Sequence, residues 1–121
     1  MHAHGIDIIE ISRIRQAVDS WGERFLERIY TAREIEYCRG RVPELAVRFA
    51  GKEAVMKALG TGKTGISSHD IEILADQKGA PVVHLTETAQ TRAAEIGLEG
   101  LTITLSHSRE YAVASVVGGM K

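Results

Sequence analysis

Two acidic residues that lie far apart in the sequence could together hold a divalent cation. Asp7 stands in the apolar segment GIDIIEI, where it shares a strand face with Ile9 and Ile11, although strands disfavour aspartate. A carboxylate there needs a partner, because burying an unpaired charge is costly. Metal ligation and a structural hydrogen bond would both meet that need. Glu53, in a long helical segment, is the second acid.

The segment that carries Glu53, LAVRFAGKEAVMKALG, has the apolar spacing of a helix with a lysine in its buried stripe. That lysine is Lys52. The other members of the stripe are Leu45, Phe49, Met56 and Leu59. Lys52 could snorkel to the surface or face another subunit. Glu53 and Lys57 are spaced i and i+4, which by itself predicts an ordinary surface ion pair worth about 0.2–0.5 kcal/mol.

These residue types together fit a site for magnesium and a diphosphate. Mg²⁺ prefers oxygen, keeps several waters, and is usually bound by one or two carboxylates plus substrate phosphates. Asp7 and Glu53 could supply the carboxylates, while Lys57 and Arg48 could hold the remaining phosphate charge. A hydrogen-bonded Asp7 and a surface pair at Glu53 would account for the same residues, so the spacing leaves both interpretations open.

His107 lies in LSHSREY, at the turn between two predicted strands. It could donate to a phosphate oxygen, shuttle a proton, or serve as a hydrogen-bonded turn residue. The other histidines have no metal-ligand spacing, and we assign them no role. They are His2, His4, His69 and His84.

The segment KALGTGKTGIS contains Gly62-Lys63-Thr64, which matches the end of a phosphate-binding P-loop. That motif also needs a glycine five positions before Gly62 and a helix after it. Position 57 is a lysine, and the flanking patterns predict a helix before the segment and a strand after it. A helix end with Gly60 and Gly62 in the left-handed conformation is the better interpretation.

The elements that must position these residues are helices in the first half of the chain and strands mainly in the second. We predict a strand at 5–11, helices at 12–21, 23–30, 31–37 and 45–59, strands at 70–75 and 82–85, a helix at 86–96, and strands at 101–106 and 111–117. The first helix has one apolar stripe, formed by Ile11, Ile14, Val18 and Trp21. Thr31 and Glu34 form a capping box. This grouping predicts an α+β fold with helices packed on an antiparallel sheet, because strands joined by short turns pair as hairpins.

The composition is that of one globular domain with balanced charge. The 121 residues, 44% of them hydrophobic, suffice for a single core spanning 1–121. The 15 Lys and Arg against 16 Asp and Glu argue against a general nucleic-acid binder. Seven of the ten arginines lie between positions 13 and 41 with only five acids, and this local excess could meet an acidic partner.

Several features predict a cytoplasmic protein. Cys38 is the only cysteine, which excludes an intrachain disulfide and a cysteine-based zinc site and suits a reducing cytosol. Its simplest role is that of a small buried hydrophobe. The start, MHAHGIDIIEI, lacks the basic n-region of a signal peptide, and no stretch approaches the roughly 18 apolar residues of a membrane span.

Five segments, taken in order, resemble one known family. They are GIDIIEISRI, RFAGKEAVMKALGTG, HDIEIL, KGAP and LSHSREYAVA. Their order and spacing and the total length are similar to those of the bacterial holo-[acyl-carrier-protein] synthases, the short type of 4′-phosphopantetheinyl transferase. The resemblance implies the fold of that family. It also implies transfer of 4′-phosphopantetheine from coenzyme A to a serine of apo acyl carrier protein, with release of adenosine 3′,5′-bisphosphate, in fatty acid biosynthesis.

The resemblance implies roles for individual residues. Asp7 and Glu53 would bind Mg²⁺, and Glu53 and Lys57 would take part in catalysis. The residues implied to line the coenzyme site are Arg48, Lys57, Gly62, Gly79, Pro81 and His107. Those implied to dock the acidic helix of the carrier protein are Arg13, Arg24 and Arg28. Family members of this length are homotrimers with active sites between subunits. The general base stays open between a metal-oriented water, Glu53 and His107.

The sequence departs from the family at Gly51, where alanine is common. A glycine inside a helix costs on the order of 0.5–1 kcal/mol, which would affect stability more than chemistry. Two other classes of protein compete with the transferase. A non-enzymatic adaptor could bind acidic proteins or RNA through residues 13–41, but this leaves Asp7 and Lys52 unexplained. A P-loop nucleotidase would hydrolyse ATP through Lys63.

Overall fold

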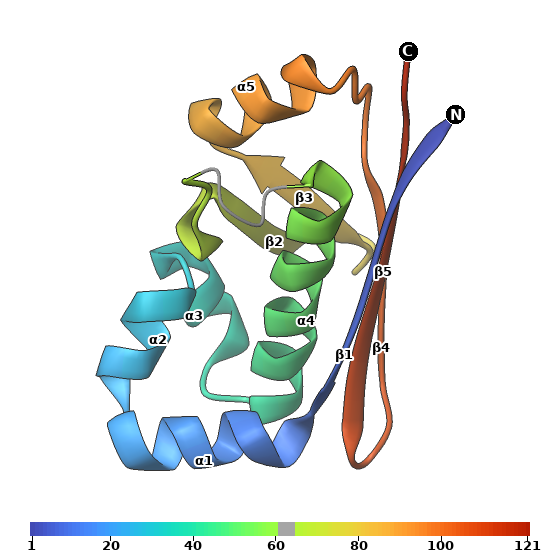
Figure 1. Ribbon diagram of the computed structural model, residues 1–121. Coiled ribbons are helices and arrows are strands. Elements are labelled where there is room, and N and C mark those ends of the chain that lie inside the picture. Colours follow the sequence, from blue (N-terminus) through green and yellow to red (C-terminus); the bar gives the residue numbers. More distant parts are fainter. Residues whose placement is uncertain (61–64) are drawn as a thin grey trace.

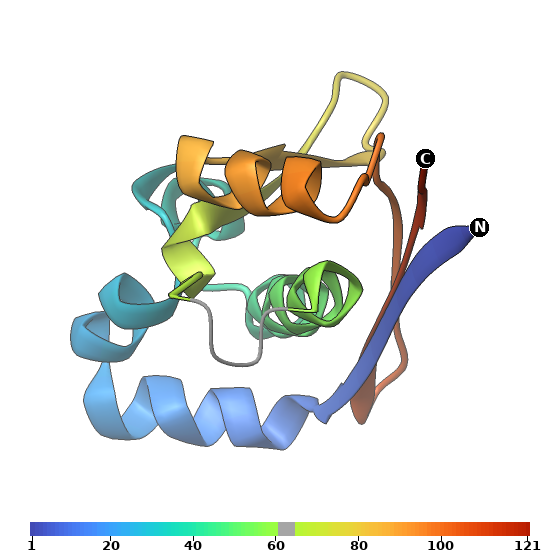
Figure 2. The ribbon, with the colours of Figure 1, turned by 45° about the horizontal axis from the view of Figure 1, so that its top comes forward.

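One long helix lies at the centre of the molecule, surrounded by strands and shorter helices (Figure 1). The computed structural model describes residues 1–60 and 65–121. Its elements are β1 (His2–Glu10), α1 (Ile11–Trp21), α2 (Glu23–Ile29), α3 (Ala32–Cys38), α4 (Val42–Leu59), the 3₁₀ turn η1 (Ser68–Asp70), β2 (Ile71–Ala75), β3 (Pro81–Leu85), α5 (Glu87–Glu95), β4 (Thr102–His107) and β5 (Tyr111–Gly119). Figure 2 looks along α4 and shows α1, α5 and the strands arranged around it.

The described strands form two antiparallel sheets, with the orders β1-β5-β4 and β2-β3. β4 and β5 pair as the predicted hairpin, from Thr102 opposite Val117 to His107 opposite Ala112. β1, from the other end of the chain, pairs with the whole of β5. The predicted fold class is confirmed. The division into two sheets was not foreseen, because short turns pair neighbouring strands without determining whether two hairpins join.

Helix α4 is buried on most of its circumference rather than along one stripe. Its buried residues are Leu45, Ala46, Val47, Arg48, Ala50, Gly51, Lys52, Ala54, Val55, Ala58 and Leu59. Small side chains let β1 approach closely: a Cβ on Gly5 would lie 1.8 Å from the carbonyl oxygen of Ala54. Only glycine fits at this crossing, and the crossing fixes where Asp7, two residues later, meets the helix.

Lys52 points into its own chain, so both expectations for it, snorkelling and contact with another subunit, are wrong. Its side chain is only 1% exposed, and its Nζ lies 2.6 Å from Oε1 of Glu34. Nζ also donates to the carbonyl oxygens of Ser68, at 2.7 Å, and of Ile71. Burial lowers the pKa of Lys52, while the negative charge of Glu34 opposes that shift.

Glu34 has two roles in the structure. It completes the predicted capping box, which is confirmed: its Oε1 accepts from the backbone N–H of Thr31 at 2.9 Å, and the Thr31 hydroxyl accepts from the N–H of Glu34. Its Oε2 accepts from the N–H of Ile73 in β2 at 2.7 Å. The buried pair of Glu34 and Lys52 therefore ties α3, α4 and β2 together.

The face of the β1-β5-β4 sheet that points away from α4 has no helix over it in either ribbon view (Figures 1 and 2). Ile6 and Ile8, which alternate with the inward Gly5 and Asp7, are each 63% exposed on this face. Tyr111 and Val117 of β5 are also exposed. Exposed apolar side chains on a sheet face without a covering helix suit contact with another protein surface.

Some element ends differ from prediction. α4 begins at Val42 rather than Leu45, because Pro43 suits the first turn of a helix. Trp21 is 61% exposed and does not continue the buried stripe of α1, in which Ile11 and Ile14 are buried. Gly60 ends α4 in the left-handed conformation, as predicted. Gly62 and the rest of the P-loop-like motif lie outside the described residues.

No helix in residues 1–60 and 65–121 combines the length and apolar character that a membrane crossing requires.

Candidate active site

Asp7, Glu53 and Lys57 meet where β1 passes along α4. Nζ of Lys57 lies 3.0 Å from Oδ1 of Asp7 and donates to the carbonyl oxygen of Ile6 at 2.8 Å. The predicted i, i+4 pair with Glu53 is replaced by this contact, because β1 brings Asp7 within reach of the lysine. Lys57 itself stays 55% exposed, so it remains accessible to a ligand.

Glu53 lies one helical turn before Lys57, and its charge and that of Asp7 act on one another. Burial raises the pKa of Glu53, the charge of Asp7 raises it further, and the charge of Lys57 opposes the shift. Mutual repulsion of this kind is relieved when a cation binds between two carboxylates. No group of three or more potential His, Cys, Asp or Glu ligands occurs among residues 1–60 and 65–121. Two carboxylates with water and phosphate oxygens suit Mg²⁺ rather than zinc.

A second group of predicted residues lines a hollow of about 170 Å³ on another side of α4. Arg48 comes from α4, Gly79 and Pro81 from the start of β3 and the turn before it, and His107 from the end of β4. These four residues, all expected at the coenzyme, are thus brought together. Other lining residues that the sequence reasoning missed are Tyr37, Glu44 and Ser106.

Arg48 forms a rigid wall of this hollow. The side chain is 3% exposed, and its Nε donates to the carbonyl oxygen of Ile73 at 2.9 Å. Nη1 lies 3.4 Å from Oε2 of Glu44, and the guanidinium carbon lies 4.5 Å from the centre of the Tyr37 ring. Tyr37 could have been noticed in the sequence as an aromatic residue among arginines, since arginines stack on aromatic rings.

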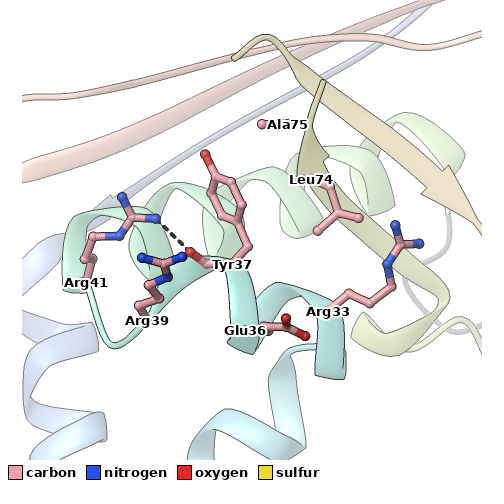
Figure 3. A pocket seen from close by; sticks show the side chains of 7 residues that line it. All are labelled: Arg33, Glu36, Tyr37, Arg39, Arg41, Leu74 and Ala75. Atoms are coloured by element: carbon pink, nitrogen blue, oxygen red, sulfur yellow. Dashed lines mark hydrogen bonds between the residues drawn. The ribbon is translucent and has the colours of Figure 1, made fainter. Parts of the chain in front are cut away.

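A larger hollow of about 680 Å³ adjoins the first and shares Tyr37 and Ala75 with it (Figure 3). Its charged lining residues are Arg33, Glu36, Arg39 and Arg41. Arg41 is held in place because it donates to the carbonyl oxygens of Tyr37, at 2.7 Å, and of Cys38, at 2.9 Å. Three cations facing one acid favour an anionic ligand, and arginine is well suited to phosphate.

Asp7 and Glu53, which we call the acid pair, lie on one flank of α4. The two hollows beside Arg48 lie on the opposite flank. Lys57 follows Arg48 by nine positions, which turns it roughly 180° around the helix axis. Asp7 faces Ala114 of β5, which in turn faces Leu105 of β4, beside the hollow. The backbones of Asp7 and Leu105 are therefore about 10 Å apart. One copy of the chain does not present both groups to a single phosphate.

The arginines predicted to bind a partner lie on α1 and α2. Arg24 and Arg28 line a hollow of about 680 Å³ between these helices, together with Trp21 and Phe25. The guanidinium carbon of Arg24 lies 5.9 Å from the centre of the Trp21 ring. Arg13 lies further back on α1, is exposed, and is not part of this lining.

Comparison with known proteins defines the class. The family model of the 4′-phosphopantetheinyl transferase superfamily matches residues 3–116, and the chain belongs to this superfamily. A holo-[acyl-carrier-protein] synthase from Halothermothrix orenii is 44% identical over 117 residues, or 94% of each chain. One from Dehalococcoides mccartyi strain 195 is 49% identical over 113 residues, or 93% of this chain and 94% of the relative.

Solved structures agree with this assignment. The crystal structure of the Helicobacter pylori holo-[acyl-carrier-protein] synthase in complex with coenzyme A has a TM-score of 0.86 at 34% identity, covering 96% of this chain and 99% of that one. The enzyme from Neisseria meningitidis has a TM-score of 0.88 at 32% identity, covering 97% of both chains. The chain is an enzyme of the holo-[acyl-carrier-protein] synthase type, a phosphopantetheinyl transferase. This supports the transferase over the adaptor and nucleotidase alternatives.

Proposed function

We propose that residues 1–121 form a single domain that transfers 4′-phosphopantetheine from coenzyme A to a serine of apo acyl carrier protein in the presence of Mg²⁺. Adenosine 3′,5′-bisphosphate is the other product, and the reaction serves fatty acid biosynthesis in the cytoplasm. The observation that carries the proposal is the meeting of Asp7 and Glu53 beside Lys57. The names of the relatives and the coenzyme A bound in the H. pylori enzyme support the donor and the acceptor.

The reaction is a displacement at the β-phosphorus of coenzyme A by the serine hydroxyl. Asp7 and Glu53 would hold Mg²⁺, which would supply charge neutralisation for the diphosphate. Lys57, which is exposed beside the two acids, holds a further phosphate oxygen. Glu53 and His107 are the candidate acceptors for the serine proton within the chain, with a metal-oriented water as the third possibility.

The rest of coenzyme A occupies the two hollows beside Arg48, contributed by a neighbouring copy of the chain. Arg48, Gly79, Pro81 and His107 line the smaller hollow, and the arginines of the larger one offer charge for the coenzyme's third phosphate group. Gly62, which the resemblance also assigns to the coenzyme, lies outside the described residues.

The protein works as a homotrimer with active sites between subunits. Two observations support this assembly. The acid pair and the coenzyme hollow of one copy stand on opposite flanks of α4, so the acid pair of one subunit can face the hollow of the next. The uncovered sheet face with Ile6 and Ile8 supplies the apolar surface that subunit contact requires.

The acidic helix of the carrier protein docks on α1 and α2 through Arg13, Arg24 and Arg28. Nucleic acid is not a partner, because the overall charge is balanced.

Incubation with coenzyme A, MgCl₂ and an apo carrier protein, followed by mass spectrometry, tests the function. We expect the carrier to gain the mass of one phosphopantetheine. Asp7→Ala and Glu53→Ala should slow this transfer by about 10²–10³-fold while melting near the wild-type temperature. Glu99→Ala, which removes an exposed carboxylate before β4 that pairs, among the residues described, only with Lys121 at 3.8 Å, is the matched control. Wild-type rates in both site variants would show that these acids do not hold the metal.

A further inference from the structure

A row of hydrogen bonds connects the buried side of α4 to the C-terminal end of α2. Nζ of Lys52 donates to the carbonyl oxygen of Ser68 in η1 at 2.7 Å. The Ser68 hydroxyl lies 3.4 Å from the carbonyl oxygen of Arg28. Nε2 of His69 lies 2.6 Å from the carbonyl oxygen of Glu27, so the imidazole donates there. We call Lys52, Ser68 and His69 the α4–α2 bridge.

Helix α2 needs such support. It has seven residues, none of them fully buried, and packs on the core through the partly buried Phe25, Leu26 and Ile29. Helices this short are marginal without tertiary contacts, so further contacts matter. The last carbonyls of a helix have no partner within it, and His69 and Ser68 supply partners for two of them. The bridge therefore contributes to the placement of α2.

The inner part of the bridge is firmly fixed. Lys52 is held by its buried pair with Glu34 and immediately precedes Glu53 in the sequence. Asp70 fixes η1 from the other side, because its Oδ2 accepts from the N–H of Ser67 at 2.8 Å and its Oδ1 accepts from the hydroxyl of Thr86 at 2.7 Å. A displacement at η1 would thus be passed to α2 rather than absorbed.

We infer that the α4–α2 bridge sets the position of the carrier-docking helix relative to the acid pair on α4, with His69 as a positioning residue at its outer end. This inference rests on the proposed docking of the carrier protein by Arg24 and Arg28, which both lie on α2. A serine that attacks phosphorus must come within about 3–3.5 Å of it, and a shift of about 1 Å is costly. Lys52 thus helps to hold α2, which carries the docking arginines, at a fixed position relative to the acid pair.

The test compares His69→Leu, which removes the donor, with His69→Gln, whose amide N–H can reach the same carbonyl. His84→Leu changes an exposed histidine on β3 and is the matched control. For each variant we would measure the Kd for the apo carrier protein by titration, the KM values for the carrier and for coenzyme A, and amide hydrogen exchange over residues 23–29 and 42–59.

His69→Leu should raise the carrier Kd and KM about fivefold, the effect of one lost hydrogen bond. Its KM for coenzyme A should stay unchanged, and exchange should accelerate in α2 but not in α4. His69→Gln should restore wild-type values, and His84→Leu should leave them unaltered. In an Arg28→Ala background, loss of His69 should have a smaller effect, because both act through α2.

Two results would overturn the inference: an unchanged carrier Kd in His69→Leu, or equal losses in the KM for the carrier and for coenzyme A with faster exchange in both helices. If the wild-type protein binds the carrier without transferring phosphopantetheine, the proposed function fails, while the Kd series still decides the role of the bridge. A wild-type protein that does not bind the carrier would refute both.

Discussion

Gly5→Ala tests whether the close crossing of β1 over α4 is what places Asp7 at the acid pair. The new Cβ would lie 1.8 Å from the carbonyl oxygen of Ala54, 2.8 Å from its carbonyl carbon and 3.1 Å from the backbone nitrogen of Ala58. All three atoms belong to the helix backbone and cannot turn aside. Because non-bonded carbon and oxygen atoms rarely approach within about 3 Å, β1 must retreat from α4 by roughly 1 Å or more.

The retreat has two measurable effects. It separates Asp7 and Ile6 from Lys57, whose present contacts are 3.0 Å and 2.8 Å long, and it widens the gap between Asp7 and Glu53. A displacement of about 1 Å at a reacting centre costs about 10²-fold in rate. Overpacking of a core typically lowers the free energy of unfolding by about 1–3 kcal/mol.

The assay is the rate of phosphopantetheine transfer as a function of Mg²⁺ concentration, with chemical denaturation in parallel. We expect Gly5→Ala to remain folded at 20 °C, to require more Mg²⁺ for half-maximal rate, and to be about a hundredfold slower. Gly119→Ala is the matched control, because Gly119 lies on β5 of the same sheet and a Cβ there meets nothing within 4 Å. A Gly5→Ala enzyme with wild-type stability and Mg²⁺ dependence would refute the reasoning.

Two further predictions concern buried ionisable groups. Lys52→Met leaves Glu34 without its cation and should lower the free energy of unfolding by about 3–5 kcal/mol, whereas Lys52→Met with Glu34→Gln should recover most of this loss; equal losses in urea titrations would count against the pair. Burial raises the pKa of the Cys38 thiol from an ordinary value near 9 to about 11, so its share of stability is present below pH 9 and lost as the pH rises through 11. The difference in unfolding free energy between wild type and Cys38→Ala should therefore shrink between pH 8 and 11, and a constant difference would contradict this assignment.

Local features were predictable from the sequence because neighbouring residues determine them. The capping box of Thr31 and Glu34, the helix end at Gly60 and the hairpin of β4 and β5 all follow from short-range rules. Lys52 could be recognised as anomalous, but its partner could not be identified. Glu34 lies on a different helix, and the capping box already explained why a glutamate stands at that position.

Long-range packing accounts for the rest. Lys57 pairs with Asp7 instead of Glu53 because β1 approaches α4 closely. Gly5 permits this approach, but the hydrophobic periodicity of the sequence does not reveal it. The surroundings of Gly51 could not be predicted from the sequence either. A Cβ there would lie 2.5 Å from Cδ1 of Ile73, so the Ile73 methyl group occupies the space that an alanine would need. This packing, which the sequence alone does not show, partly offsets the loss of helix stability expected from a glycine.

The opposed placement of the acid pair and the coenzyme hollow on α4 has a consequence for mixed populations. In the proposed assembly, each chain contributes Asp7 and Glu53 to one catalytic centre. It contributes the hollow lined by Arg48 and His107 to another. Two inactive proteins, one lacking Asp7 and the other lacking His107, would rebuild some intact centres when their subunits exchange. Activity regained on mixing would distinguish shared centres from self-contained ones without any structure of the complex.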